Sequence, residues 1–384
     1  VGLGPFLLES YTPDQNVTMV RNPYFFGYDQ NGTQLPYIDK WVVLIVESQD
    51  VSLLKFRNGE IDALAIRPSD VPILVPEAAA NDFEVKIGSG VAGTLWISFN
   101  EDYGLGEGDP AKDQMRGLFR DIRFRKAVAH AMDKQSIISN LYNGLAAPQW
   151  SPVSVGTPWY GGRDYYGGPV TENNAVSYEY SLDIAAGLLD DIGVVDNDGD
   201  GIREFADGQP VEFLLETNAG NTLREGFCLI LADDLEKIGV KANFQPIDFN
   251  TLVTRLLGGT LYEAAVVGLT GTTDPHGGSN VARTTGGLHF WHYSAPDDPY
   301  AYELRIDELF DLGMGTFDLD EAFGYYLEYQ ILDATDSLGM IYSVNQQFTY
   351  AIYNHIGNQE VADVASTPTG FPGRTREFIF FENL

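Results

Sequence analysis

Five acidic residues between positions 196 and 207 form the densest group of possible metal ligands in the sequence. They are Asp196, Asp198, Asp200, Glu204 and Asp207. Alternating carboxylates followed by a glycine at the sixth place, as in the run DNDGDG, let one loop wrap oxygen ligands around Ca²⁺. The twelfth place holds an aspartate instead of a bidentate glutamate, so a plain Asp/Gly turn is the alternative. We predict a structural calcium ion here and no cofactor that the function requires.

Three histidines form a second group of possible metal ligands. His276, His289 and His292 lie within 17 residues of one another, with Asp274 beside the first. Imidazole and carboxylate groups together suit nickel. However, these residues lack a compact ligand spacing such as His-Glu-x-x-His. The sequence therefore favours structural roles for the three histidines over direct metal binding.

A loop that follows an apolar run is the first candidate for ligand binding. The run EAAVVGL at 263–269 is typical of a buried strand, and Asp274 and Pro275 come shortly after it. Ligands often bind just beyond the carboxyl ends of strands in α/β folds. Asp274 is therefore a candidate ligand-binding residue. The alternative is that Asp274 only forms a turn ahead of Pro275.

Two tryptophans and an asparagine extend this candidate site. Trp291 and Trp96 could provide the apolar and aromatic walls that binding sites need, although a core role suits each equally well. Asn100 ends the strand predicted at 94–100 and is the fourth candidate ligand-binding residue. We predict no catalytic residue, because the sequence lacks a Gly-x-Ser-x-Gly elbow, a phosphate-binding loop and a dinucleotide fingerprint.

The elements that must position these residues alternate between strands and helices. Strands are predicted at 94–100, 211–217, 240–247 and 263–269, and helices at 181–192, 222–238, 249–257, 301–312 and 319–335. Such alternation indicates an α/β lobe. Residues 1–66 are expected to be rich in strands, and the continuous apolar run at 41–46 predicts a strand covered on both faces.

Composition limits the class of protein. The 384 residues suffice for two or more compact lobes. A net charge of −32 argues against binding nucleic acid, which needs clustered basic residues, and against docking on an anionic membrane. No apolar run is long enough to span a bilayer. Cys228 is the only cysteine, so neither an intrachain disulfide nor a cysteine-based zinc site can form, and a buried helical position is expected.

Two sets of motifs resemble one known family. Residues 118–160 predict two helices, with Asp121 and Asp133 as amino-terminal caps and Gly144 closing the second. This segment resembles a signature of the bacterial extracellular solute-binding proteins, the dipeptide/oligopeptide/nickel-binding cluster that serves ABC importers. Its matching residues are Asp121, Arg123, Arg125, Ala127, Ala131, Met132, Asp133, Lys134, Ile137, Gly144, Ala147 and Pro152. The amino-terminal matches are Gly2 to Phe6, Asn22 to Phe25, Ile38, Asp39 and Gly59 to Asp62.

The resemblance implies an α/β, periplasmic-binding-protein-like fold of type II, with two lobes and mixed sheets. It places 1–93 and the return segment 348–384 in a first lobe and 94–347 in a second, ligand-binding α/β lobe. Family members begin well upstream of the Gly-Pro-Phe motif, so the first lobe is expected to be incomplete. The missing amino-terminal part of the same protein would then be a partner.

The resemblance also implies a function. We expect an extracytoplasmic protein, periplasmic or extracellular, that captures a small ligand and delivers it to an ABC transporter permease. Its membrane association would come through the transporter or a lipid anchor absent from this chain. A peptide is the first ligand expected, because an aspartate at the position of Asp274 pairs with the ligand's α-amine in peptide-binding relatives. Capture would be non-covalent, with lobes that close by hinge motion.

Two alternatives stay open. The first is an oligosaccharide-binding protein of the same family, since 12% aromatic residues suit sugar stacking as well as core packing. The second is a hydrolase that acts on a peptide or sugar in the cleft between the lobes. A hydrolase needs a nucleophile or an acid–base pair in the cleft, and the sequence offers no specific support for either. We therefore expect a binding protein and not an enzyme.

Overall fold

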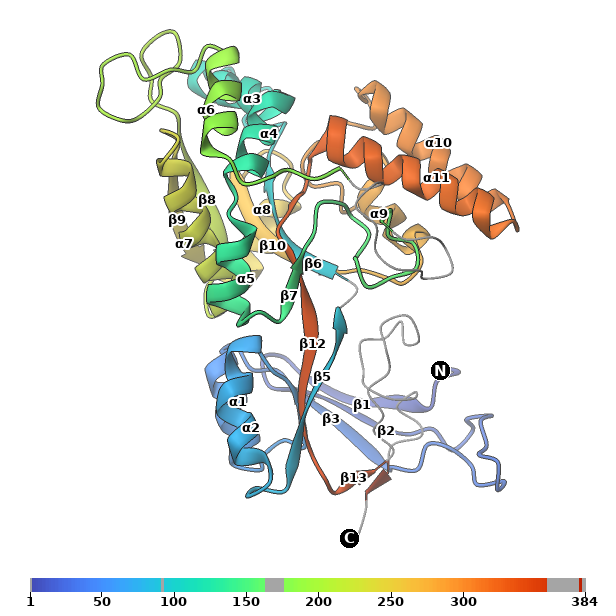
Figure 1. The fold of residues 1–384 in the computed structure, drawn as a ribbon. Helices are drawn as coiled ribbons and strands as arrows, with labels where there is room; N and C mark the ends of the chain where they lie inside the picture. Colours follow the sequence, from blue (N-terminus) through green and yellow to red (C-terminus); the bar gives the residue numbers. More distant parts are fainter. Residues whose placement is uncertain (1, 91–92, 163–175, 358–379, 382–384) are drawn as a thin grey trace. The chain divides into compact units, whose positions relative to one another are not determined.

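The computed structural model describes residues 2–90, 93–162, 176–357 and 380–381 (Figure 1). The chain forms two compact units. Unit 1 comprises Val1–Ser89 with Gln347–Leu384, and unit 2 comprises Gly90–Gln346. The sequence-based boundaries after residues 93 and 347 lie close to these divisions. Much of the expected return segment, at 358–379 and 382–384, lies outside the described residues.

Among the described residues, unit 1 contains three small sheets, the smallest of which pairs β13 with β14. An antiparallel sheet has the order β1-β2-β3, and a second sheet has the order β4-β12-β5. Its strands are β1 (Phe6–Thr12), β2 (Asn16–Arg21), β3 (Lys40–Leu44), β4 (Ala63–Ala65), β5 (Phe83–Gly90), β12 (Val344–Tyr353), β13 (Ile356–Gly357) and β14 (Phe380–Phe381). Its helices are α1 (Gln49–Arg57), the 3-10 turn η1 (Pro68–Asp70) and α2 (Val71–Ala78). The sequence analysis did not predict α2 or β5.

The expectation that residues 41–46 form a fully covered strand is wrong. Strand β3 is present, but Val42 and Val43 are 49% and 42% exposed. Helix α1 likewise buries only Phe56 and leaves Leu54 exposed. Because successive side chains of a strand point to opposite faces, both faces of β3 are partly exposed within the described part of the chain, as is one side of α1.

Unit 2 is built on a five-stranded sheet of order β11-β6-β10-β8-β9. Its strands are β6 (Gly93–Phe99), β8 (Glu212–Asn218), β9 (Lys241–Ile247), β10 (Ala264–Thr270) and β11 (Ile341–Tyr342). Strand β7 (Ala146–Pro148) pairs with the first three residues of β12, which belong to unit 2. Strand β8 runs parallel to both β9 and β10, which the intervening helices α7 (Thr222–Glu236) and α8 (Phe249–Leu256) make possible. The predicted α/β alternation is thereby confirmed.

Side chains of β6 alternate between two cores, as the period of a strand requires. Ile97 and Phe99 enter a core that α4 (Ile122–Ala131) and α7 cover. In this core the Phe99 ring packs edge-to-face on Phe124, with ring centroids 4.9 Å apart. Trp96 points into a second core, to which α8 contributes. The sheet is therefore covered on both faces.

The helices with the family-like signature form as expected. The Asp121 carboxylate accepts a hydrogen bond from the Arg123 N–H at 2.8 Å and caps α4. The Asp133 carboxylate accepts from the Ser136 N–H at 2.9 Å and caps α5 (Lys134–Tyr142). Helix α5 ends where Asn143 and then Gly144 adopt positive φ angles.

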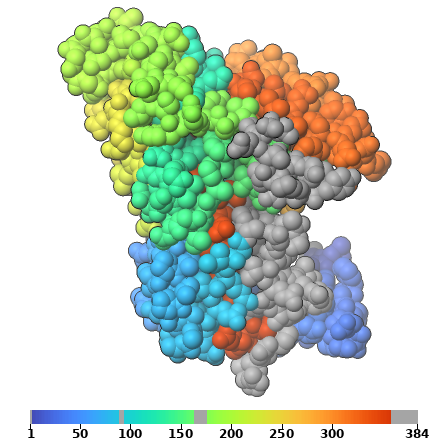
Figure 2. Space-filling model, in the orientation of Figure 1, coloured from blue at the N-terminus to red at the C-terminus, as the bar shows by residue number. Residues whose placement is uncertain are grey.

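The remaining helices surround this frame. They are α3 (Pro110–Arg120), α6 (Leu182–Asp191), α9 (Ser279–Ala282), α10 (Ala301–Gly315), α11 (Leu319–Leu332), the 3-10 turn η2 (Pro275–Gly278) and the π-helical turn η3 (Asp333–Ser337). Helix α3 begins within a stretch rich in glycine and aspartate, where Asp109 caps it. Helices α10 and α11 form an exposed flank of unit 2, drawn in orange in Figure 2.

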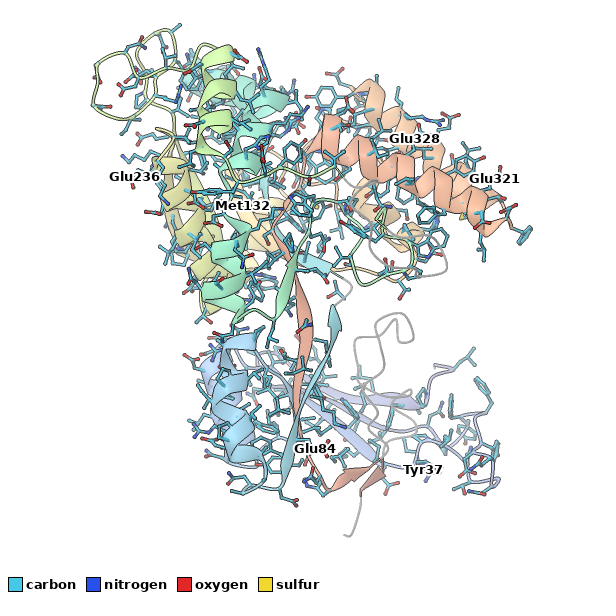
Figure 3. All side chains as sticks on the ribbon, viewed as in Figure 1. Tyr37, Glu84, Met132, Glu236, Glu321 and Glu328 are labelled. Atoms are coloured by element: carbon cyan, nitrogen blue, oxygen red, sulfur yellow. The ribbon has the colours of Figure 1, made fainter. Side chains whose placement is uncertain are left out.

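The surface carries the large negative charge. Glu236 on α7 and Glu321 and Glu328 on α11 are examples that Figure 3 labels. Cys228 on α7 is fully buried, as predicted. No helix among the described residues is long and apolar enough to cross a membrane.

Candidate functional site

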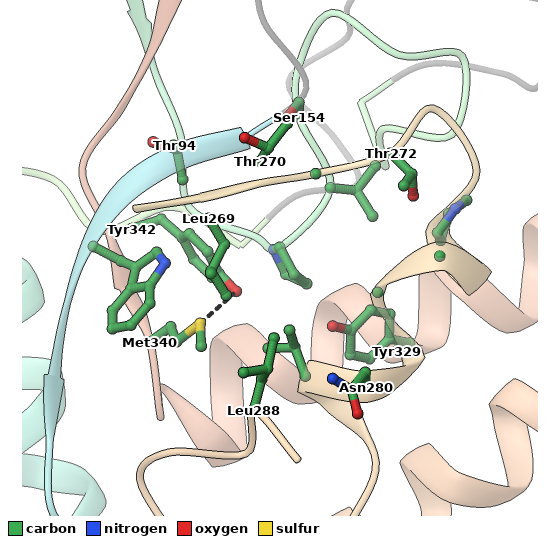
Figure 4. A pocket seen from close by; sticks show the side chains of 18 residues that line it. Thr94, Ser154, Leu269, Thr270, Thr272, Asn280, Leu288, Tyr329, Met340 and Tyr342 are labelled. Carbon is green, nitrogen blue, oxygen red and sulfur yellow. Dashed lines mark hydrogen bonds between the residues drawn. The ribbon is translucent and has the colours of Figure 1, made fainter. Parts of the chain in front are cut away.

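A pocket of about 280 Å³ opens in unit 2 beside the carboxyl end of β10 (Figure 4). Segments far apart in the sequence contribute its walls. The lining residues are Thr94, Trp96, Pro152, Val153, Ser154, Leu269, Thr270, Gly271, Thr272, Pro275, Gly277, Gly278, Asn280, Val281, Leu288, Tyr329, Met340 and Tyr342. The pocket therefore lies where the sequence analysis expected a ligand, just beyond a strand of the α/β lobe.

The lining is apolar with a few neutral polar groups. Among the described residues that line the pocket, no side chain is charged. Hydroxyl and amide groups come from Thr270, Thr272 and Asn280, while Leu269 and Leu288 are apolar (Figure 4). Apolar walls with a few oriented polar groups are typical of small-molecule sites. The arrangement can hold an uncharged part of a ligand by contact and hydrogen bonds.

The two predicted tryptophans take different places. Trp96 lines the pocket, and its ring stacks on Phe290 with centroids 6.0 Å apart. Trp291 lies in the same buried cluster but is not part of the lining. A Cβ at Gly339 would approach the Trp291 ring to 2.4 Å, so this glycine lets the indole pack closely. Trp291 thus packs in the core behind the lining residues Trp96 and Met340.

Asn100 is fully buried behind the end of β6. Its side-chain amide donates to the carbonyls of Gly259 and Tyr262, each at 2.9 Å, and its carbonyl accepts from the Asp102 N–H. The residue is absent from the pocket lining. These hydrogen bonds fix the backbone that follows β6. Ligand contact by the Asn100 side chain stays a prediction.

Asp274 is exposed at the start of η2, next to the lining residue Pro275. Its carboxylate accepts from the His276 N–H at 2.8 Å and so caps the turn. This is the turn role that the sequence analysis kept as the alternative. Capping uses only part of the carboxylate's hydrogen-bonding capacity, so the ligand-binding role also stays a prediction.

A buried lysine, which the sequence analysis quoted only as a motif residue, fixes two walls of the pocket. The Lys134 ammonium donates to the backbone carbonyls of Gln149 and Tyr342 and lies over the Trp150 ring. Burial lowers its pKa well below the usual value. Gln149 leads into the lining residues 152–154, and Tyr342 itself lines the pocket. One side chain therefore holds both segments in place.

A buried acid lies close to the pocket tyrosines. Asp333 begins η3 and is 4% exposed, and its Oδ2 has no hydrogen-bond partner among the described residues. Burial raises the pKa of this carboxyl to about 8. Burial and, to a smaller degree, Asp333 raise the pKa values of Tyr329 and Tyr342. No sequence pattern indicated this buried carboxyl, because a π-helical turn has no clear pattern.

Four of the five predicted calcium ligands come together. Ligand atoms of Asp196, Asp198, Asp200 and Glu204 all lie within 4.8 Å of one another, whereas Asp207 is outside this group. Both carboxylate oxygens of Asp196 accept backbone N–H groups, from Gly199 and Gly201. These hydrogen bonds hold the described loop in shape, and calcium binding stays a prediction.

Replacement of Asp333 should change the pH dependence of stability. Its folded-state pKa of about 8 exceeds the ordinary value of 3.8, so the folded chain holds this proton more tightly than the unfolded chain. The free energy of unfolding should therefore fall as pH rises from about 4 to about 8. Urea denaturation across this range should show a smaller fall for Asp333→Asn. Asp336→Asn, at an exposed position of the same turn, is the control and should keep the slope of the parent.

Calcium should raise the melting temperature of the chain if the acidic loop binds it. Asp200→Asn should weaken binding measured by isothermal titration calorimetry, since it removes a charged ligand. Asp207→Asn should leave binding nearly unchanged, because Asp207 lies outside the group. If neither calcium nor a chelator changes the melting temperature, calcium binding at this loop is excluded.

Comparisons with known proteins agree with this fold. Residues 1–288 match the family model of bacterial extracellular solute-binding proteins, family 5 middle part. A probable ABC transporter-binding protein of Deinococcus radiodurans is 28% identical over 334 residues, which cover 82% of this chain and 53% of that protein. A periplasmic alpha-galactoside-binding protein of Rhizobium meliloti is 25% identical over 376 residues, covering 88% of this chain and 49% of that protein.

A solved structure shows the same architecture. The oligopeptide-binding protein of Bacillus subtilis, in complex with a nonapeptide, superposes with a TM-score of 0.77 at 19% identity, covering 99% of this chain and 66% of that one. The periplasmic-binding-protein-like fold is thereby confirmed. The chain spans about half the length of the two curated relatives. The matched model covers most of the chain, which therefore belongs to family 5 of the bacterial extracellular solute-binding proteins.

Proposed function

We propose that this chain is the ligand-capturing part of a solute-binding protein that works outside the cytoplasm and delivers its ligand to an ABC transporter permease. The observation that carries the proposal is the pocket beside β10, in a chain of this family. The preorganised walls, fixed by Lys134 and by Trp291, suit reversible capture. Deletion of the gene should abolish uptake of the ligand by the host, and unchanged uptake would contradict the transport role.

The first proposed ligand is a small peptide. The name of the Bacillus subtilis relative and its nonapeptide complex support a peptide. The exposed Asp274 carboxylate at the rim could pair with a free α-amine, because it sits beside the lining residue Pro275. A charge-assisted pair of this kind recognises the peptide terminus without reading side chains.

An oligosaccharide is the second candidate, and a specific observation favours it. The pocket lining is uncharged and combines the Trp96 ring with neutral hydroxyl and amide groups. Such a surface suits the hydroxyl groups and apolar faces of sugar rings. The alpha-galactoside-binding relative of Rhizobium meliloti supports the same class.

We also propose that capture involves no chemistry on the ligand. Proteins of the matched family are described as solute-binding proteins. The described pocket lining offers hydroxyl and amide groups without an accompanying carboxylate or histidine that could act as a base. Ligand recovered unchanged after long incubation with the chain is the expected result, and turnover would support the hydrolase alternative.

The amino group of the ligand provides the decisive test between peptide and sugar. A peptide with a free amino terminus should bind about tenfold more tightly than its N-acetylated form, because a hydrogen bond to a charged group is lost. Asp274→Asn keeps the capacity to cap η2 and should abolish this difference in calorimetric affinity. Asp298→Asn, at another exposed position, is the matched control. Binding of an alpha-galactoside oligosaccharide but of no peptide would establish the second candidate.

We further propose that the preceding part of a longer polypeptide covers the exposed apolar side chains of unit 1. Val42 and Val43 on β3, with Leu54 on α1, support this partner. Backbone amides of β3 should exchange hydrogen more slowly in such a longer polypeptide than in this chain, because burial restricts opening. Equal exchange rates, measured by mass spectrometry, would contradict the proposal; the amides of β8 serve as the internal control.

A further inference from the structure

Two histidines and a glutamate meet in the interior of unit 2, outside the pocket lining. His289 and His292 lie in the loop before α10, and Glu303 lies in the first turn of that helix. These three side chains are at most 4% exposed. The His289 Nε2 atom is 3.2 Å from Glu303 Oε1, and the His292 Nδ1 atom is 2.9 Å from the same oxygen.

The hydrogen bond on the far side of the His289 ring constrains its protons. His289 Nδ1 lies 3.0 Å from the Val281 carbonyl oxygen, which can only accept, so Nδ1 carries a hydrogen. In a neutral ring, Nε2 then presents a lone pair toward Glu303.

A lone pair on His289 and a carboxylate oxygen at 3.2 Å repel each other. A metal ion between these two atoms would attract both of them. Metal-binding histidines commonly donate their other ring N–H to a backbone carbonyl. The hydrogen bond from His289 Nδ1 to the Val281 carbonyl is of this kind. The Tyr300 N–H donates to Glu303 Oε2 at 2.8 Å and fixes the carboxylate in the same way.

The spacing of the three side chains suits a metal ion. Atoms bound to zinc at about 2.0–2.2 Å lie roughly 3 Å or a little more from one another. The distance of 3.2 Å from His289 to Glu303 is of this size, and that of 2.9 Å from His292 to Glu303 is slightly shorter. One ligand atom from each side chain lies within 4.8 Å of the others. Two imidazoles with one carboxylate form a common zinc ligand set, in which a water completes the tetrahedron.

The other charged side chains near the group already form ion pairs among the described residues. Arg125 lies 3.3 Å from Glu101, and Arg120 lies 2.6 Å from Asp102, so these two arginines already have acidic partners. Glu303 has no arginine or lysine partner among the described ion pairs, and a cation between it and the imidazoles would neutralise it.

We propose that His289, His292 and Glu303 form a binding site for one zinc ion in unit 2, and that the ion holds the loop before α10 against that helix. The proposal is independent of the ligand-binding function. It differs from the sequence-based grouping, because His276 is absent from the cluster and instead lies 3.3 Å from the Tyr326 hydroxyl. Glu303 was missed by the sequence analysis, since its distance along the chain hides the contact.

Zinc titration of the full chain tests the site. After treatment with a chelator, the chain should take up one equivalent of zinc, measured by mass spectrometry of the metal, and its melting temperature should rise. His289→Gln should weaken zinc binding by at least about tenfold, measured by competition with a chromophoric chelator. Glu303→Gln keeps an oxygen that can accept from Tyr300 and should weaken binding similarly. His276→Gln is the matched control and should bind zinc like the parent.

Cobalt provides a readout that does not depend on the variants' folding. Cobalt bound at the unmodified site should give the visible absorption of a four-coordinate ion, and added zinc should remove that absorption. Failure of the stripped chain to bind either metal would overturn the proposal. Zinc uptake that His289→Gln and Glu303→Gln both leave unchanged would overturn it as well.

Discussion

The two-sided burial of strand β6 is the constraint on which unit 2 depends. Its side chains alternate, so that Ile97 and Phe99 enter one core while Trp96 enters the other. A strand placed in this way needs a covering layer on each face, and its neighbours in the sheet provide the same alternation. On β10, Val266 joins the core of Phe99, and Val267 joins that of Trp96. A shift of one residue in register would exchange the contents of both cores.

The pocket follows from this arrangement. Trp96 belongs to the second core and also forms part of the pocket lining, so the wall that a ligand would touch is continuous with the packed interior. The loop after β10 supplies one rim, and Lys134 fixes two further segments through their carbonyl groups. A ligand would therefore meet walls that are already ordered, which reduces the conformational entropy lost on binding.

Sequence reasoning was most successful where local patterns decide structure. The caps at Asp121 and Asp133 form helices as expected, because a carboxylate before a helical run satisfies free N–H groups of the first turn. The strands and helices of the α/β alternation were likewise found from their apolar periods. Strand β3 shows the limit: its composition indicates burial on two faces, but burial depends on which layers are present.

The site was harder to predict, because its residues come together only through tertiary contacts. Trp96 lines the pocket and Asp274 lies beside it, whereas Tyr329 and Met340 reach it from segments without a functional signal in the sequence. Asp333 depends on a single π-helical turn, and the pairing of His289 with Glu303 joins a loop to a helix. Such contacts have no period or spacing that a sequence can display.

The burial of the chain's only cysteine has a practical consequence. Cys228 is fully enclosed on α7, and burial raises the pKa of its thiol, so the reactive thiolate is scarce at neutral pH. A single cysteine introduced on the surface would consequently be the only readily accessible thiol. Probes could be attached there without first removing the native residue, which makes spectroscopic distance measurements between chosen points of the chain straightforward.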